Sequence, residues 1–154
     1  MGREEKALFA STYQVALTAE QKYTIDRNIV SLIEENQDCT FYLFFPPYSI
    51  LGFEELVLLN RIDVVLSCKD YLVKRLQAFK NAFIFDFTAD ETITNNLDNY
   101  VDFIHYRNAG SDMIIRTLKD KKNSIDYVTS AENSKKLFMQ LRHFDIEVLK
   151  SNLK

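Results

Sequence analysis

The sequence predicts an α/β fold in which parallel strands are flanked by helices. Two short apolar runs, at residues 41–45 and 82–87, are typical of buried strands because they are too short for ordinary helices. A long apolar-rich helical stretch separates the runs, and amphipathic patterns precede the first run and follow the second. This order is that of a βαβ unit with additional helices, and its crossover should be right-handed.

The chain has no internal repeat, low-complexity tract or Pro/Gly/Ser-rich linker. We therefore expect a lead-in at residues 1–17 and a single α/β domain at residues 18–154. Thr18 and Gln21 have the spacing of a capping box, in which each side chain accepts a hydrogen bond from the other residue's backbone amide. This box would begin a helix that ends near residues 36–38. Its apolar stripe consists of Ile25, Ile29, Leu32 and Ile33.

The two predicted strands would supply an aromatic core. Residues 41–45 are continuously apolar, which favours a strand buried on both faces. Pro46 and Pro47 should end this strand because proline cannot donate to a ladder. Burial contributes about 2 kcal/mol per phenylalanine before chain entropy is subtracted. The phenylalanines expected in the core are Phe41, Phe44, Phe45, Phe83, Phe85 and Phe87.

The connection between the strands is predicted as one long helix over about residues 53–79. Glu54 and Glu55 would lie in its first turn, where the helix dipole favours anions. Asn60 and Ser67 are the two positions at which this helix could be interrupted.

Two more helices are expected after the second strand. The first covers about residues 108–119 and buries Met113, Ile114 and Leu118. Ser130 is expected to cap the last helix. The apolar residues of that helix are Leu137, Phe138, Leu141 and Leu149.

A sheet of only two parallel strands would leave both outer edges unpaired, which is a poor independent fold. We expect the sheet to be completed from outside this chain, by a missing N-terminal segment or by a second copy in a homo-oligomer. The alternative is that further strands near the N-terminus escape recognition.

Composition excludes several classes of function. The chain is 47% hydrophobic and 27% charged, as globular proteins are, and its net charge of -3 argues against a nucleic-acid surface. Three glycines are too few for a glycine-rich phosphate loop, and two histidines are too few for a histidine-rich metal cluster. We therefore expect no cofactor, no metal and no nucleic-acid partner.

The sequence as written predicts a cytoplasmic location. No apolar stretch approaches the length that a bilayer requires, and the first six residues contain no apolar signal core. Cys39 and Cys68 are expected to be free, buried thiols, with a disulfide as the alternative.

The candidate site residues lie in the polar loop after the second strand. Asp102 and His105 are three residues apart near the carboxyl end of a predicted strand, where α/β folds bind their ligands. An imidazole that takes a proton and a carboxylate that orients it are two parts of a nucleophilic triad. On spacing alone, a partly buried histidine bonded to backbone and a turn-forming aspartate are the more common arrangement.

Three segments together resemble the C-terminal half of SGNH-type, or GDSL-like, hydrolases. They are FFPPYS at 44–49, FIFDF at 83–87 and NLDNYVDFIHY at 96–106. The likeness is greatest to a bacterial branch associated with cell-surface polysaccharides. It implies a partial flavodoxin-like, three-layer fold, with Asp102 as the orienting acid and His105 as the general base. It also implies an ester hydrolase or O-acyltransferase that acts on a glycan, and full-length relatives that are exported or membrane-anchored.

The other catalytic blocks of that family are not recognisable here. The family's serine nucleophile lies in a Gly-Asp-Ser-like block near the start of the domain, and a Gly and an Asn from two further blocks help form the oxyanion hole. Ser11 lacks both the flanking residues and the preceding strand. The chain therefore resembles the C-terminal part of a larger enzyme, and we expect it to be inactive alone. A non-catalytic interaction or oligomerisation module is the alternative.

Four other residues are candidates for which an ordinary role is favoured. Ser49 lies between a strand and a helix, as in a nucleophile elbow, but it lacks the glycines of that turn, so a helix N-cap is expected. Tyr48 should cover the end of the sheet rather than line a cleft. Asp86 is expected to bond loop amides, and His143 should meet solvent or a surface ion pair.

Overall fold

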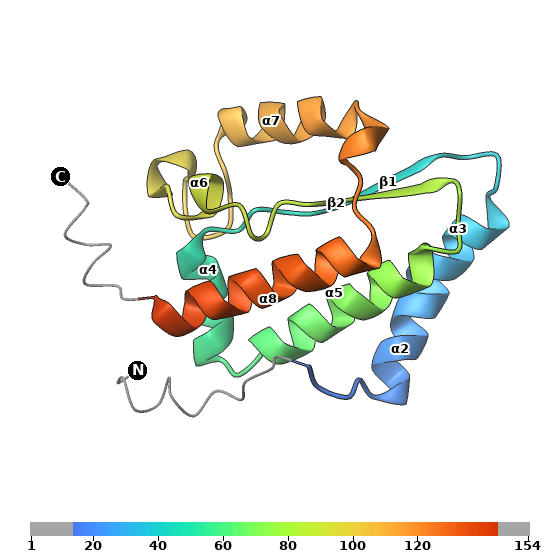
Figure 1. The fold of residues 1–154 in the computed structure, drawn as a ribbon, viewed down its shortest axis with the longest axis horizontal. Helices are drawn as coiled ribbons and strands as arrows, with labels where there is room; N and C mark the ends of the chain where they lie inside the picture. Colours follow the sequence, from blue (N-terminus) through green and yellow to red (C-terminus); the bar gives the residue numbers. More distant parts are fainter. Residues whose placement is uncertain (1–13, 145–154) are drawn as a thin grey trace.

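The computed structural model describes residues 14–144, in which helices surround a short sheet (Figure 1). The helical turns α2 (Ala19–Ile25), η1 (Asp26–Val30) and α3 (Ser31–Glu35) run on from one another, the middle one with π-helical bonding, and precede β1 (Phe41–Phe45). Next come α4 (Ile50–Leu58), α5 (Ile62–Leu76) and β2 (Ala82–Asp86). The remaining elements are α6 (Glu91–Thr94), η2 (Leu97–Asn99), α7 (Asn108–Leu118), η3 (Lys121–Asn123) and α8 (Tyr127–His143).

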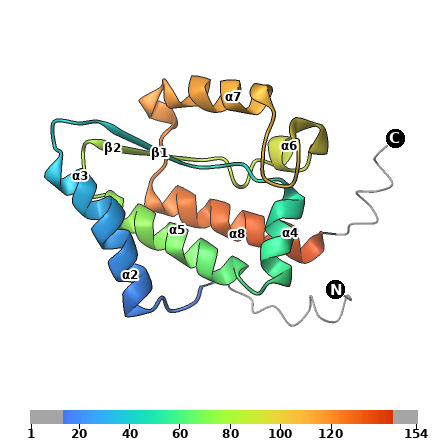
Figure 2. The ribbon, with the colours of Figure 1, turned by 180° about the vertical axis from the view of Figure 1, so that it is seen from behind.

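The two predicted strands form a parallel pair. Their register runs from Phe41 opposite Ala82 to Phe45 opposite Asp86. One face of the pair carries α7, and the opposite face carries α5 and α8, as the two opposed views show (Figures 1 and 2). The predicted parallel strands with flanking helices are therefore confirmed. Residues 14–144 contain no third strand, so β1 has one free edge within this part of the chain.

The inner face of the sheet packs on helices and forms one of the cores. Phe41, Leu43 and Phe45 of β1 alternate along the strand and contact this core, which includes Ile84 of β2. The buried helical residues in the same core are Val30, Ile33, Leu72, Val73 and Leu76. Leu137, Phe138 and Leu141 of α8 are buried as predicted, against α4 and α5, whereas Leu149 lies outside the described residues.

The outer face of β1 is not buried, and the prediction of a strand covered on both faces is wrong. Tyr42 and Phe44 are 43% and 39% exposed. The reason is that α7 covers only β2, where Ile114 packs with Phe85 and Phe87. Phe44 therefore does not belong to the core that a continuous apolar run suggests.

Lys121 lies across this outer aromatic face. Its ammonium nitrogen is 4.3 Å from the ring centroid of Phe83 and 5.7 Å from that of Tyr42. Both distances fall within the range in which a cation is attracted to an aromatic ring. The cation thus partly covers the exposed ring of Tyr42 on β1.

The connection between the strands consists of two helices rather than the one long helix that the sequence predicts. Asn60 has φ of 53°, in the left-handed region that asparagine tolerates better than most residues, and it ends α4. The first helix starts at Ile50, so Glu54 and Glu55 do not lie in its first turn. Asn60 is thus a real interruption, whereas Ser67 lies inside α5 and accepts a hydrogen bond from the Val15 amide.

The other helix ends are a mixture of confirmed and corrected predictions. The capping box of Thr18 and Gln21 is present in both directions, with donor–acceptor distances of 3.2 and 2.8 Å. The helix expected at residues 108–119 is α7. The prediction that Ser130 caps the last helix is wrong: Asp126 accepts from the Thr129 amide, and Ser130 is buried one turn inside α8.

Candidate functional site

The loop that carries the predicted pair is closed into a tight turn. Tyr100 and Tyr106 form an antiparallel bridge. Inside it, the Val101 amide donates to the His105 carbonyl at 2.8 Å, and just outside it the Arg107 amide donates to the Asn99 carbonyl at 2.7 Å. These bonds fold the chain back on itself, so the two residues of the pair are neighbours in space as well as in sequence.

Asp102 and His105 are in direct contact, as the triad interpretation requires. The Nδ1 atom of His105 is 2.6 Å from Oδ2 of Asp102, while Oδ1 accepts from the amides of Ile104 and His105 at 2.8 and 2.7 Å. An ionised carboxylate can only accept, so it holds the imidazole tautomer that is protonated at Nδ1. The turn-forming interpretation of Asp102 is also correct, whereas a partly buried histidine is not found: the side chain of His105 is 77% exposed.

The hydrogen bonds to Asp102 lower the pKa of its carboxyl group to about 2, from an ordinary 3.8. The His105 amide is the largest cause, followed by the Ile104 amide and the His105 side chain. Because the pKa of Asp102 is lower in the folded chain than in the unfolded chain, the ionised carboxyl group stabilises the fold. This stabilisation is complete above the unfolded pKa and is lost as the pH falls through the folded pKa.

We therefore expect the Asp102–His105 contact to persist to about pH 3 and to disappear near pH 2. Carboxyl-carbon NMR of Asp102 against pH measures this transition directly. A His105→Gln variant is the control, because it keeps the two amide donors and removes the imidazole. Its carboxyl should titrate between 2 and 3.8. Titration of wild-type Asp102 at 3.8 would contradict the contact.

His105 borders a groove at the carboxyl end of β1, where α/β folds bind ligands. The groove has a volume of about 500 Å³. Apart from His105 itself, the lining side chains are mostly aromatic or apolar: Phe44, Pro46, Tyr48, Ile104 and Tyr106. Tyr48 thus lines a groove, contrary to the favoured expectation that it only covers the sheet end. Since Nδ1 is taken by Asp102, Nε2 is the ring nitrogen left to act on a ligand.

The other serines considered do not supply a nucleophile within the described residues. Ser49 is fully buried, accepts from the Gly52 amide at 3.2 Å and donates to the Phe103 carbonyl at 2.7 Å. The N-cap expectation for Ser49 is confirmed. Ser11 lies outside the described residues.

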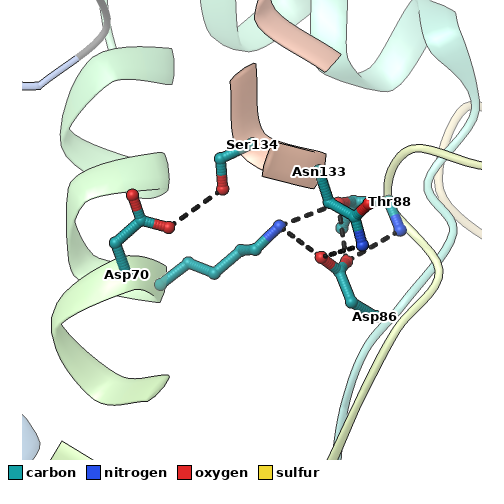
Figure 3. A network of polar contacts seen from close by, with 6 residues as sticks. Asp70, Asp86, Thr88, Asn133 and Ser134 are labelled. Atoms are coloured by element: carbon teal, nitrogen blue, oxygen red, sulfur yellow. Dashed lines mark hydrogen bonds and ion pairs between the residues drawn. The ribbon is translucent and has the colours of Figure 1, made fainter. Parts of the chain in front are cut away.

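A buried polar network lies at the end of β2, on the face opposite α7. Asp86 accepts from the Thr88 amide, as expected of a loop-bonding aspartate, and from the Thr88 hydroxyl and the Asn133 amide group (Figure 3). Its main partner is Lys69 of α5, whose Nζ is 2.7 Å from Oδ2; the two side chains are 4% and 0% exposed.

Sequence reasoning did not identify Lys69, although a signal was present. Lys69 falls on the apolar stripe of α5 between Leu66 and Val73, and a lysine on such a stripe needs a buried partner. Beside it, Asp70 accepts from the Ser134 hydroxyl at 3.0 Å (Figure 3). The network joins α5, β2 and α8, and it fixes the start of the loop that leads to Asp102.

The remaining candidates have no evident chemistry. His143 is exposed, and its Nδ1 lies 2.8 Å from the Met139 carbonyl oxygen. Cys39 and Cys68 are free, and Cys39 is exposed rather than buried. Residues 14–144 contain no group of three potential metal ligands and no helix long and apolar enough to cross a membrane.

Comparisons with protein-family models, curated proteins and solved structures found no match to this chain. Function must therefore be inferred from the site itself.

Proposed function

We propose that this chain is the C-terminal part of an SGNH-like ester hydrolase or O-acyltransferase that acts on a glycan. Its fold would then be the closing part of a larger flavodoxin-like domain. One observation carries the proposal: a solvent-facing imidazole is held at 2.6 Å by a carboxylate and borders a groove at the carboxyl end of a parallel strand. The acid and base of a nucleophilic triad have the same arrangement, which supports the proposal.

In the proposed mechanism, a serine attacks the acyl carbonyl of the ester and His105 Nε2 takes the serine proton. Asp102 holds the ring and stabilises the imidazolium that forms. The bond between the carbonyl carbon and the alcohol oxygen then breaks, and His105 gives its proton to the leaving alcohol, which leaves the acyl group on the serine. In the second step His105 takes the proton of the attacking water or hydroxyl group and returns it to the serine as the acyl–serine bond breaks. Transfer of the acyl group to water gives hydrolysis, and transfer to a glycan hydroxyl gives O-acylation.

The serine and the oxyanion hole would come from a segment outside residues 14–144, on the same polypeptide or on a partner chain. The unpaired edge of β1 supports a nucleophile supplied by another segment. A strand added there in parallel would have its carboxyl end beside the groove that His105 borders. The resemblance further implies that the whole enzyme is exported or membrane-anchored.

The test uses two reagents. The chain alone should hydrolyse p-nitrophenyl acetate no faster than its His105→Ala variant. Protein purified from its native cells should react with a fluorophosphonate at a serine outside residues 14–144, and His105→Ala should slow this labelling by about a hundredfold or more, the usual contribution of a general base. Equal labelling of wild type and variant, or robust turnover by the chain alone that requires His105, would contradict the proposal.

A non-catalytic interaction module is the second candidate. It is favoured by Tyr42 and Phe44, two aromatic side chains that are exposed on the outer face of β1. Under this alternative, Tyr42→Arg should abolish the cellular phenotype of the chain while His105→Ala leaves it intact. The reverse pattern supports the enzyme.

A further inference from the structure

The turn that carries Asp102 and His105 is attached to the molecule through its middle residue. The carbonyl oxygen of Phe103 accepts two hydrogen bonds from Ser49, one from the hydroxyl at 2.7 Å and one from the amide at 3.2 Å. Phe103 lies between Asp102 and His105 in the chain, so these bonds hold the backbone that connects the two residues.

Gly52 makes this close approach possible. A Cβ atom at Gly52 would lie 2.6 Å from the Phe103 carbonyl oxygen, closer than real Cβ contacts, and the clashing atom is backbone. The Gly52 amide also donates to the Ser49 hydroxyl, which orients that hydroxyl toward Phe103. The first turn of α4 and the loop therefore fit together only with glycine at this position.

A second attachment holds the start of the turn. The Tyr100 hydroxyl donates to the Pro47 carbonyl at 2.7 Å, and Tyr100 is buried. Burial is also the main reason why the pKa of Tyr100 is raised to about 12, so the phenol stays protonated and able to donate. The hydrogen bonds of both attachments end on residues 47–49, between β1 and α4.

These attachments matter because the turn has little other support. Between the bridging residues Tyr100 and Tyr106, the side chains of Val101, Phe103 and Ile104 are all exposed, so burial of the tip of the turn does not fix its position. The hydrogen bonds between Asp102 and the amides of Ile104 and His105 set the shape of the turn but not its place on the molecule.

We infer that Ser49, Gly52 and Tyr100 are positioning residues that hold the Asp102–His105 pair at the rim of the groove. Their catalytic purpose rests on the proposed function, whereas the contacts themselves do not. Ser49, which sequence alone made a candidate nucleophile or cap, thus acts through the Phe103 carbonyl rather than on a substrate. A pair placed this way would meet an incoming serine in a fixed orientation, and this preorganisation supplies much of the rate in triads.

The test is NMR of the whole chain, which contains only two histidines. His143 serves as an internal reference because it is remote from the turn in sequence and has its own partner, the Met139 carbonyl. We expect Ser49→Ala and Gly52→Ala each to shift the ring-proton signals of His105, because these signals depend on the place of the ring beside the groove aromatics Phe44 and Tyr48. The pKa of Asp102 should stay at about 2, because the amides that lower it lie inside the turn. The His143 signals should not change.

Loss of a helix cap must be separated from loss of the attachment. Asp126→Ala removes the N-cap of α8 and should leave the His105 and Asp102 signals unaltered. Gly52→Ala favours the helix by intrinsic propensity, so its effect on the turn comes from the clash with Phe103. If a variant at Ser49 or Gly52 fails to fold, Tyr100→Phe decides the question, because it removes only one hydroxyl.

Unchanged ring-proton signals of His105 in the folded variants would overturn the inference. If those signals change but no serine in the native protein reacts with a fluorophosphonate, the attachment stands and the proposed function fails.

Discussion

Replacing Asp86 by alanine is expected to lower the free energy of unfolding by about 3–5 kcal/mol, the usual cost of leaving one member of a buried ion pair alone. Asp86 is completely buried and is 2.7 Å from Lys69. Without it, the partners that the Lys69 ammonium keeps among residues 14–144 are the Thr88 hydroxyl at 3.1 Å and the ring of Phe45, whose centroid is 5.4 Å away. Chemical denaturation of the purified chain measures the loss.

Two variants make this expectation specific. The double variant Lys69→Met with Asp86→Leu should recover much of the stability, because replacing both charges by apolar groups avoids an unpaired buried charge. Lys136→Ala is the matched control: it breaks the exposed pair with Glu91 and should change stability by about 0.5 kcal/mol or less. If Asp86→Ala costs no more than Lys136→Ala, the buried pair does not stabilise the junction of α5, β2 and α8.

If the chain has the proposed function, Asp102→Asn is expected to reduce turnover of an acyl ester by the assembled protein by about a thousandfold or more. The asparagine side chain can present its NH₂ group to the imidazole, which favours the tautomer protonated at Nε2, and that nitrogen must instead be free to take the serine proton. The measurement is kcat for an activated acetyl ester. Asp98→Asn, an exposed aspartate in the same loop, is the control and should retain full activity.

The two residues of the pair should also act as one unit. A double variant, Asp102→Asn with His105→Ala, should be no slower than His105→Ala alone, because the aspartate works only through the imidazole. Additive losses would show that Asp102 has a separate role.

Local features of the fold were predictable from the sequence because they depend on neighbouring residues. The capping box at Thr18 and the N-cap at Ser49 follow from side chains that reach amides two or three positions away. Both strands were located by continuous apolar runs. The contact of Asp102 with His105 belongs to the same class, since their separation of three residues allows one turn to join them.

Features that depend on distant segments were not predictable. Whether Phe44 is buried depends on how far α7 extends over the sheet. The apolar run at residues 41–45 carries no information about the position of that helix. Asp126 and Ser130 are both good caps, and the choice between them is made by packing: Ser130 is buried, and the Ile125 amide donates to the Ile84 carbonyl. The apolar stripe of α5 indicates that Lys69 is buried, but its partner Asp86 lies 17 residues away and is identified only by the fold.

The lysine that crosses the outer aromatic surface has a consequence for how this protein behaves in concentrated solution. A short strand rich in phenylalanine and tyrosine, with unsatisfied amides along one side, is a template for fibril growth. A hydrated ammonium group above Phe83 and Tyr42 discourages the stacking of further copies, as gatekeeper lysines do in other sheets. Acetylation of Lys121 would neutralise that charge, and we therefore expect it to favour association between copies of the chain.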